Sequence, residues 1–204
     1  KAWAAADETV APLINSALIL CADHELNASS FTARCAASAG STPYAVVNAG
    51  LSALQGYRHG GHTERVEALF REATEDPRQT IVDRLKRGES IAGFGHQLYP
   101  DGDPRAKFLL AQIERTKGDA PAFRTAQGII NAVERAVHLK PNIDFALVTL
   151  AQAYSLPMGA PLTLFAIGRV AGWIGHAIEQ YQSNRLIRPR ARYIGNSPRF
   201  PQSS

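Results

Sequence analysis

Residues 160–178 read APLTLFAIGRVAGWIGHAI and form the longest apolar stretch in the chain. Four residues interrupt it: Gly168, Arg169, Gly172 and Gly175. A membrane-spanning helix needs about 20 nearly uncharged residues, so we expect a buried helix of a soluble protein over about residues 162–182. The three glycines would let another backbone approach this helix closely, in a helix–helix or a subunit contact.

Working outward from this stretch, the same helical spacing of apolar residues recurs along the chain. Further helices are expected over residues 7–22, 28–39, 44–55 and 121–139. Polar residues and prolines mark the starts of four more: a helix that begins at a Thr63 cap, one from Asp76-Pro77 to Gly88, one from Asp103-Pro104 to 116, and one from Pro141-Asn142 to 155. Residues 88–104 are rich in Gly, Pro and Asp and are expected to form a loop. No alternating strand pattern rises above this periodicity. The sequence therefore predicts an all-α architecture of at least eight packed helices.

Charge and cysteine content narrow the function classes. The formal net charge is +4, which is modest for a nucleic-acid-binding protein. Arginines gather near the C-terminus at 185, 188, 190, 192 and 199, but no aromatic residues alternate with them, so we expect no nucleic-acid partner. Cys21 and Cys35 are too few for a disulfide framework, and we expect buried thiols in a reducing, cytoplasmic compartment. No Cys/His spacing predicts a zinc site.

Three polar clusters fall at predicted helix boundaries. The first is Asp23 to Ser29, between two Ala-rich helices. The second is the glycine-flanked loop that holds His59 and His62, where a ligand can approach closely; the sequence alone does not rank the two histidines. The third is Gly93 to Arg105, a long loop after which Arg105 and free backbone N–H groups could together hold an anion.

Two charged residues stand out within apolar helices. Asp144 lies in the first turn of its helix, where a carboxylate stabilises the helix dipole without any catalytic role. Arg169 interrupts a helix that is apolar nearly all round. Because a buried, unpaired charge costs several kcal/mol, Arg169 either reaches water or faces an anion in a cleft.

The clusters follow one another in a distinctive order. They are Asp23-His24-Glu25-Leu26-Asn27-Ala28-Ser29, His59-Gly60-Gly61, Gly93-Phe94-Gly95-His96, Asp103-Pro104-Arg105, Asn142-Ile143-Asp144-Phe145, Leu164-Phe165-Ala166-Ile167-Gly168-Arg169 and Arg188-Pro189-Arg190. In this order, from about Leu20 to Gly195, they resemble the citrate synthase family. The resemblance implies a multi-helical homodimer that condenses an acyl-CoA, usually acetyl-CoA, with oxaloacetate and uses no cofactor.

The resemblance also implies roles for single residues. Among the catalytic residues, His59 would hydrogen-bond the thioester carbonyl and Asp144 would be the base that removes the methyl proton. His96 would polarise and protonate the ketone oxygen of oxaloacetate. The oxaloacetate ligands would be His24, Arg105, Arg169 and, from the partner subunit, Arg188. The backbone of Ile91, Ala92, Gly93, Phe94 and Gly95 would contact CoA.

In the family the cleft separates two domains. By analogy the small domain covers residues 63–160, while 1–62 and 161–204 belong to an incomplete large domain. The family's chain has a helical segment before the His24 motif that is missing here, and this chain starts at Lys1 with Met158 as its only Met. We expect a fragment, or a second polypeptide that supplies those helices.

Two departures from the family pattern leave alternatives open. His62-Thr63 stand where the family usually has Ala-Asn, and Gln97 to Asp101 provide none of the basic residues that often hold CoA phosphates. The alternatives are a 2-methylcitrate synthase that uses propionyl-CoA, or an impaired fragment or regulatory relative that binds oxaloacetate-like anions. A citryl-CoA lyase is disfavoured because Asn27-Ala28-Ser29 resembles the synthases.

Overall fold

The computed structural model describes residues 7–196. This part of the chain contains nine helices and no strands. The helices are α1 (Val10–Cys21), α2 (Ala28–Ser38), α3 (Pro43–Leu54), α4 (His62–Glu72), α5 (Pro77–Lys86), α6 (Pro104–Lys117), α7 (Pro121–Val137), α8 (Ile143–Ala153) and α9 (Ala160–Ser183). The predicted all-α class is confirmed, and the segment between α5 and α6 is the expected loop.

Short polar residues begin most of these helices. Asp76 and Asp103 cap α5 and α6, each directly before a proline at the first helical position, and Asn142 caps α8. The predicted Thr63 cap is wrong. Helix α4 already begins at His62, and the buried Thr63 hydroxyl donates to the carbonyl of Gly60.

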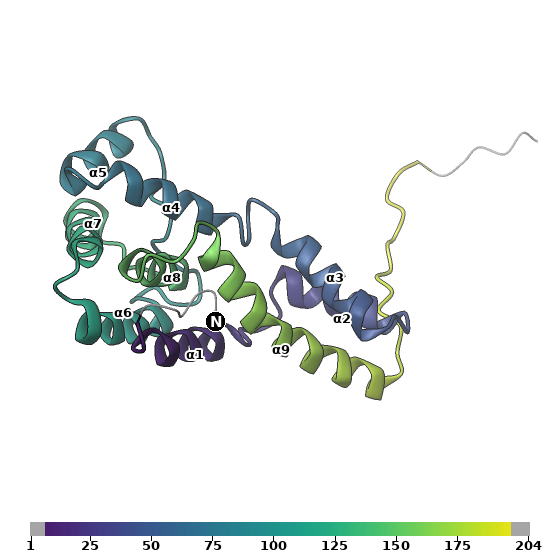
Figure 1. Cartoon of the computed structure of the whole chain (residues 1–204). Coiled ribbons are helices and arrows are strands. Elements are labelled where there is room, and N and C mark those ends of the chain that lie inside the picture. Colours follow the sequence, from purple (N-terminus) through teal and green to yellow (C-terminus); the bar gives the residue numbers. More distant parts are fainter. Residues whose placement is uncertain (1–6, 197–204) are drawn as a thin grey trace, which may run out of the picture.

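Two hydrophobic cores lie on either side of α8. One core joins α8 to α1, α2, α3, α6 and α9, and the other joins it to α4, α5, α7 and the loop at 91–94. Ala146 and Leu150 face the first core, whereas Phe145 and Val148 face the second. Figure 1 shows α8 among α4, α6 and α7, with α9 leading from there towards α2 and α3.

The domain boundaries at 62/63 and 160/161 stay a prediction. Within the range expected to form the small domain, α6 packs on α1 as well as on α8. No helix in residues 7–196 is long and apolar enough to cross a membrane. The expectation of buried thiols is confirmed for Cys21, whereas Cys35 is only half-buried.

Glycines on α9 bring its backbone against α1. A Cβ added to Gly168 would lie 2.6 Å from the Leu18 carbonyl oxygen, and one on Gly172 would collide with the carbonyl oxygen of Ala22. Around Gly175 a Cβ would meet nothing within 4 Å. The predicted close approach is therefore confirmed for the first two glycines and wrong within this chain for Gly175.

This difference predicts opposite stability effects on one helix. Gly168→Ala should lower the free energy of unfolding by about 1–3 kcal/mol, because a backbone carbonyl cannot move away cheaply. Gly175→Ala should raise it by up to about 1 kcal/mol through helix propensity. Urea unfolding followed by circular dichroism measures both, and equal effects of the two substitutions would contradict this packing.

Candidate active site

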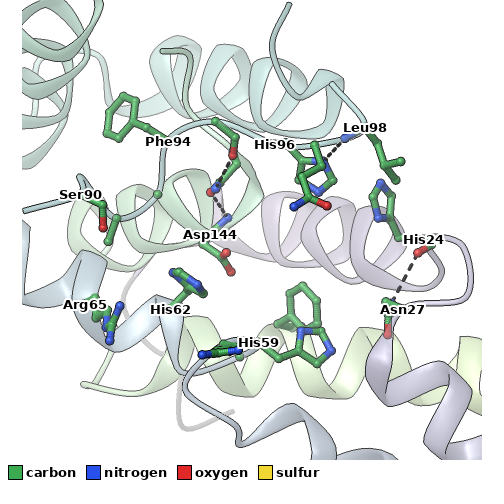
Figure 2. Close-up of a pocket in the computed structure, with 18 of the residues that line it drawn as sticks. His24, Asn27, His59, His62, Arg65, Ser90, Phe94, His96, Leu98 and Asp144 are labelled. Carbon is green, nitrogen blue, oxygen red and sulfur yellow. Dashed lines mark hydrogen bonds between the residues drawn. The ribbon is translucent and has the colours of Figure 1, made fainter. Parts of the chain in front are cut away.

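A cleft of about 1040 Å³ opens where the ends of α4, α6 and α8 meet α9 and the loop before α2. Of the site residues predicted from sequence, those that line it are His24, His59, Ile91, Ala92, Gly93, Phe94, Gly95, His96, Arg105, Asp144 and Arg169. Figure 2 shows the Asp144 carboxylate near the middle, with His96 and His24 towards one side and His59 and His62 across from it. Segments far apart in sequence thus converge on one cavity.

The loop at 93–95 is fastened to the start of α8. The backbone N–H and the side chain of Asn142 donate to the carbonyl oxygens of Gly93 and Gly95, respectively. The Gly95 N–H donates in turn to the backbone carbonyl of Lys140. Gly93 has φ +85°, and a Cβ there would lie 2.9 Å from Val66. The positive φ and the crowding both require glycine. These contacts hold the loop beside Asp144.

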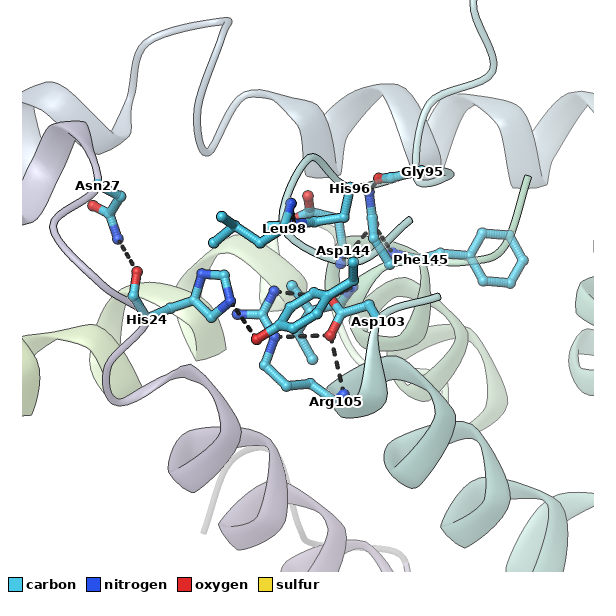
Figure 3. A network of polar contacts seen from close by, with 12 residues as sticks. His24, Asn27, Gly95, His96, Leu98, Asp103, Arg105, Asp144 and Phe145 are labelled. Carbon is cyan, nitrogen blue, oxygen red and sulfur yellow. Dashed lines mark hydrogen bonds and ion pairs between the residues drawn. The ribbon is translucent and has the colours of Figure 1, made fainter. Parts of the chain in front are cut away.

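A buried ion pair positions Arg105. The Asp103 carboxylate accepts from Nε and Nη2 of Arg105 at 2.9 and 2.8 Å, and also from the backbone N–H groups of Arg105 and Ile143 (Figure 3). Burial alone would raise the pKa of Asp103, but the hydrogen bonds and charge of Arg105 outweigh it and hold that pKa below its usual value. One carboxylate therefore joins the starts of α6 and α8.

Arg169 does not reach bulk water. Its side chain is 1 % exposed, its Nε donates to the Cys21 carbonyl at 2.7 Å, and its guanidinium lies over the Phe165 ring. Nη1 is buried and has no hydrogen-bond partner in the described part of the chain. Of the two alternatives left by the sequence, a charge that faces the cleft is the one observed. An unpaired guanidinium N–H at a cavity wall is suited to an anionic ligand.

Asp144 occupies the centre of the cleft. Burial is the main cause that raises its pKa to about 6, while the positive charge of Arg105 opposes the shift. Its backbone N–H donates to the Asn142 side chain, which fixes the first turn of α8. A carboxylate with a raised pKa in a cleft is a candidate proton acceptor for a carbon acid.

His59 is held by a buried hydroxyl. Ser29 Oγ lies 2.8 Å from His59 Nε2 and 2.8 Å from Asn27 Oδ1, and Trp173 Nε1 donates to it at 3.3 Å. Burial, followed by the charges of Arg169 and His62, lowers the pKa of His59. The imidazole is therefore neutral at pH 7, and burial is the leading cause.

His96 and His24, on the other side of Asp144, are also neutral at pH 7. His96 Nδ1 accepts from the Leu98 N–H, so its hydrogen is on Nε2 and available to a ligand. His24 Nε2 lies 2.9 Å from the Tyr99 hydroxyl, and burial together with Arg105 lowers the His24 pKa to about 4. Burial also lowers the pKa of His96.

Several residues in and next to this cleft were not predicted from the sequence. No site role was predicted for Ser29 and Tyr99, which contact His59 and His24. None was predicted either for six polar residues of the cleft wall: Arg58, Arg65, Arg84, Glu89, Ser90 and Asn142. One local signal for Arg65 was present in the sequence. This residue is three residues after His62, so both side chains lie on the same face of α4.

Two predicted features lie elsewhere. Arg188 is exposed in the segment after α9 and does not line the cleft of this chain. Its proposed contact with the partner's site stays a prediction, and Arg199 lies outside the described residues. Residues 7–196 contain no group of three or more His, Cys, Asp or Glu side chains that could hold a metal ion.

Comparisons with known proteins agree with the sequence motifs. The family profile described as "Citrate synthase, C-terminal domain" matches residues 1–190. Citrate synthase of Haloferax volcanii is 38% identical over 195 residues, citrate synthase 2 of Bacillus subtilis 40% over 186, and 2-methylcitrate synthase of Shewanella oneidensis 35% over 192. These matches cover 93%, 89% and 92% of this chain but 52%, 50% and 51% of the relatives. The chain thus spans about half the length of these relatives.

Solved structures show the same fold. Citrate synthase of Thermoplasma acidophilum, in a ternary complex with carboxymethyl coenzyme A and oxaloacetate, has a TM-score of 0.82 and 33% identity. The match covers 96% of this chain and 55% of that one. Citryl-CoA lyase of Hydrogenobacter thermophilus has a TM-score of 0.84 and 26% identity, and the match covers 96% of this chain and 81% of the lyase. With the family profile matching nearly the whole chain, this protein belongs to the citrate synthase family.

Proposed function

We propose that the protein is a citrate synthase-type acyltransferase that condenses acetyl-CoA with oxaloacetate to give citrate and CoA. The observation that carries this proposal is the position of Asp144, a carboxylate with a raised pKa between neutral histidines on both sides of one cleft. A thioester α-proton is a weak acid. An aspartate removes it effectively only if a hydrogen-bond donor stabilises the developing enolate oxygen.

The end of the cleft at His24 is suited to a dicarboxylate. Arg105 and Arg169 line this part of the cavity, and the buried Nη1 of Arg169 lacks a partner in the described chain. We assign these residues to the carboxylates of oxaloacetate. His96, which carries its hydrogen on Nε2, would donate to the ketone oxygen and transfer the proton as the new carbon–carbon bond forms.

His59 would polarise the thioester carbonyl. Because Nε2 faces Ser29, this role requires the neutral ring to carry its hydrogen on Nδ1. That tautomer requires Nε2 to accept the Ser29 hydroxyl hydrogen, which Asn27 Oδ1 then no longer receives. Asp144 removes the methyl proton, the enol carbon attacks the ketone carbon, and water then hydrolyses the citryl thioester to citrate and CoA.

Two related reactions use the same groups. The similarity to a 2-methylcitrate synthase supports propionyl-CoA as an alternative donor, and one extra methylene changes binding by only about 1–3 kcal/mol. The match to 81% of a citryl-CoA lyase supports a test of the reverse carbon–carbon bond cleavage, in which citryl-CoA would give acetyl-CoA and oxaloacetate in the same cleft. The regulatory alternative, binding of an oxaloacetate-like anion without turnover, needs only Arg105, Arg169 and His24.

We also propose a homodimer in a reducing, cytoplasmic compartment. The exposed Arg188 would complete the oxaloacetate site of a partner subunit, and the cleft would lie between a small domain at 63–160 and the flanking segments. The cysteines are free thiols, and burial raises the pKa of Cys21 to about 12, so it is inert to oxidation as a thiolate. The reaction requires no cofactor, since acyl-CoA is a substrate.

Replacing the proposed base tests the reaction itself. Release of free CoA from acetyl-CoA or propionyl-CoA with oxaloacetate should fall about a thousandfold in Asp144→Asn. The variant should also be more stable at pH 7 by about 3 kcal/mol, because its folded state no longer holds a desolvated carboxylate whose pKa is raised to about 6. This gain should disappear below about pH 4, where Asp is protonated in both states. Unchanged turnover would exclude Asp144 as the base.

The pH dependence provides a separate test. The rate should depend on the ionised form of Asp144, so kcat/KM for the acyl-CoA should fall about tenfold per unit below pH 6. The four cleft histidines, all with lowered pKa values, add no further loss between pH 7 and 8. An acid limb centred above pH 7 would assign the base to another group.

The dicarboxylate end can be tested without turnover. Arg169→Met retains much of the buried volume and removes the charge, so oxaloacetate affinity measured by calorimetry should fall about 10–100-fold. The melting temperature should not fall by the amount expected for a broken ion pair, because Nη1 has no partner to lose. Equal affinity in both proteins would make Arg169 structural.

A further inference from the structure

Five arginines line the cleft, and they differ in their ionic partners. They are Arg58, Arg65, Arg84, Arg105 and Arg169. Arg105 is paired with Asp103, and Arg84 lies 2.7 Å from a carboxylate oxygen of Glu72 and 3.5 Å from one of Glu89. Arg169 is buried against Cys21 at the dicarboxylate end. Two of these five charges are thus already compensated.

Arg58 and Arg65 have no carboxylate partner within residues 7–196 at ion-pair distance. Both side chains are exposed, and Arg58 rests on the Tyr57 ring with its Nε donating to the Tyr57 hydroxyl. In Figure 2, Arg65 and Ser90 lie at the end of the cleft away from His24, and His62 lies between Arg65 and Asp144. The uncompensated positive charge is therefore on the α4 side of this end.

The opposite wall offers no such charge. After His96 the chain continues with Gln97 and Leu98, which line the cleft without a cation. The backbone at 91–95 brings mainly buried apolar residues and two glycines. Apart from Arg84, which is already paired with two glutamates, the cations open to an anionic ligand at this end of the cleft come from α4 and the loop before it.

We propose that Arg65, together with Arg58, binds the phosphate groups of the acyl-CoA. This rests on the proposed function, in which the acyl carbon lies between Asp144 and His59. With the dicarboxylate at the His24 end, the rest of the CoA leaves past His62 towards Arg65. A planar guanidinium can bind a phosphate through two parallel hydrogen bonds, and the negative charge of phosphates would give these two arginines the anionic partner that they lack. The phosphate-binding charge therefore comes from α4, not from the segment after His96.

Arg65→Gln tests the proposal, with Arg71→Gln as the matched control. Arg71 is an exposed arginine on the same helix that does not line the cleft. In Arg65→Gln the KM for acetyl-CoA should rise about tenfold, with kcat and the KM for oxaloacetate within twofold of the parent values. Adding Arg58→Gln should raise the KM further. The control should change none of these constants.

Direct binding separates this inference from the proposed reaction. Calorimetry with free CoA should show about a tenfold weaker Kd in Arg65→Gln, and added salt should weaken CoA binding less in the variant than in the parent. CoA binding that depends on Arg65 in a protein without turnover would retain the inference and reject the reaction. An unchanged Kd for CoA, or a loss confined to oxaloacetate, would overturn the inference.

Discussion

The carboxylate of Asp103 is the group on which the geometry of the cleft depends. It is fully buried, and it receives hydrogen bonds from the Arg105 side chain and from backbone N–H groups at the starts of two helices. Removing one partner of such a pair leaves an uncompensated charge and costs about 3–5 kcal/mol. The two helix starts are therefore fixed relative to each other, and Asp144, one residue beyond Ile143, is fixed with them.

The cleft combines rigid and adjustable groups. Asp144 and Arg169 extend from α8 and α9, which are packed on the hydrophobic cores, and the loop at 93–95 is hydrogen-bonded to residues just before α8. Around His59 the arrangement depends on one hydroxyl hydrogen, that of Ser29, which has two acceptors within 2.8 Å. Heavy-atom positions are thus set by packing, while the proton positions can follow the ligand.

The fold class was predicted from local signals, whereas most residues of the cleft were predicted from the resemblance to the citrate synthase family. Asp76-Pro77, Asp103-Pro104 and Asn142 mark helix starts through cap chemistry, and the structure has helices at each of them. Thr63 was mistaken for a cap because Gly61, the residue at the N-cap position of α4, has no side chain to signal it. The contacts of Ser29 and Tyr99, at sequence separations of 30 and 75, have no local signature. The roles assigned to the site residues remain predictions.

The burial of α8 on both sides has an evolutionary consequence. A substitution at Phe145, Ala146 or Leu147 disturbs close packing, so this wall of the cleft can change only together with its neighbours. His62, Arg65 and Gln97 line the same cleft but belong to neither core. Single substitutions at these three positions can therefore change the shape or charge of the cleft without disturbing either core, whereas substitutions beside α8 cannot.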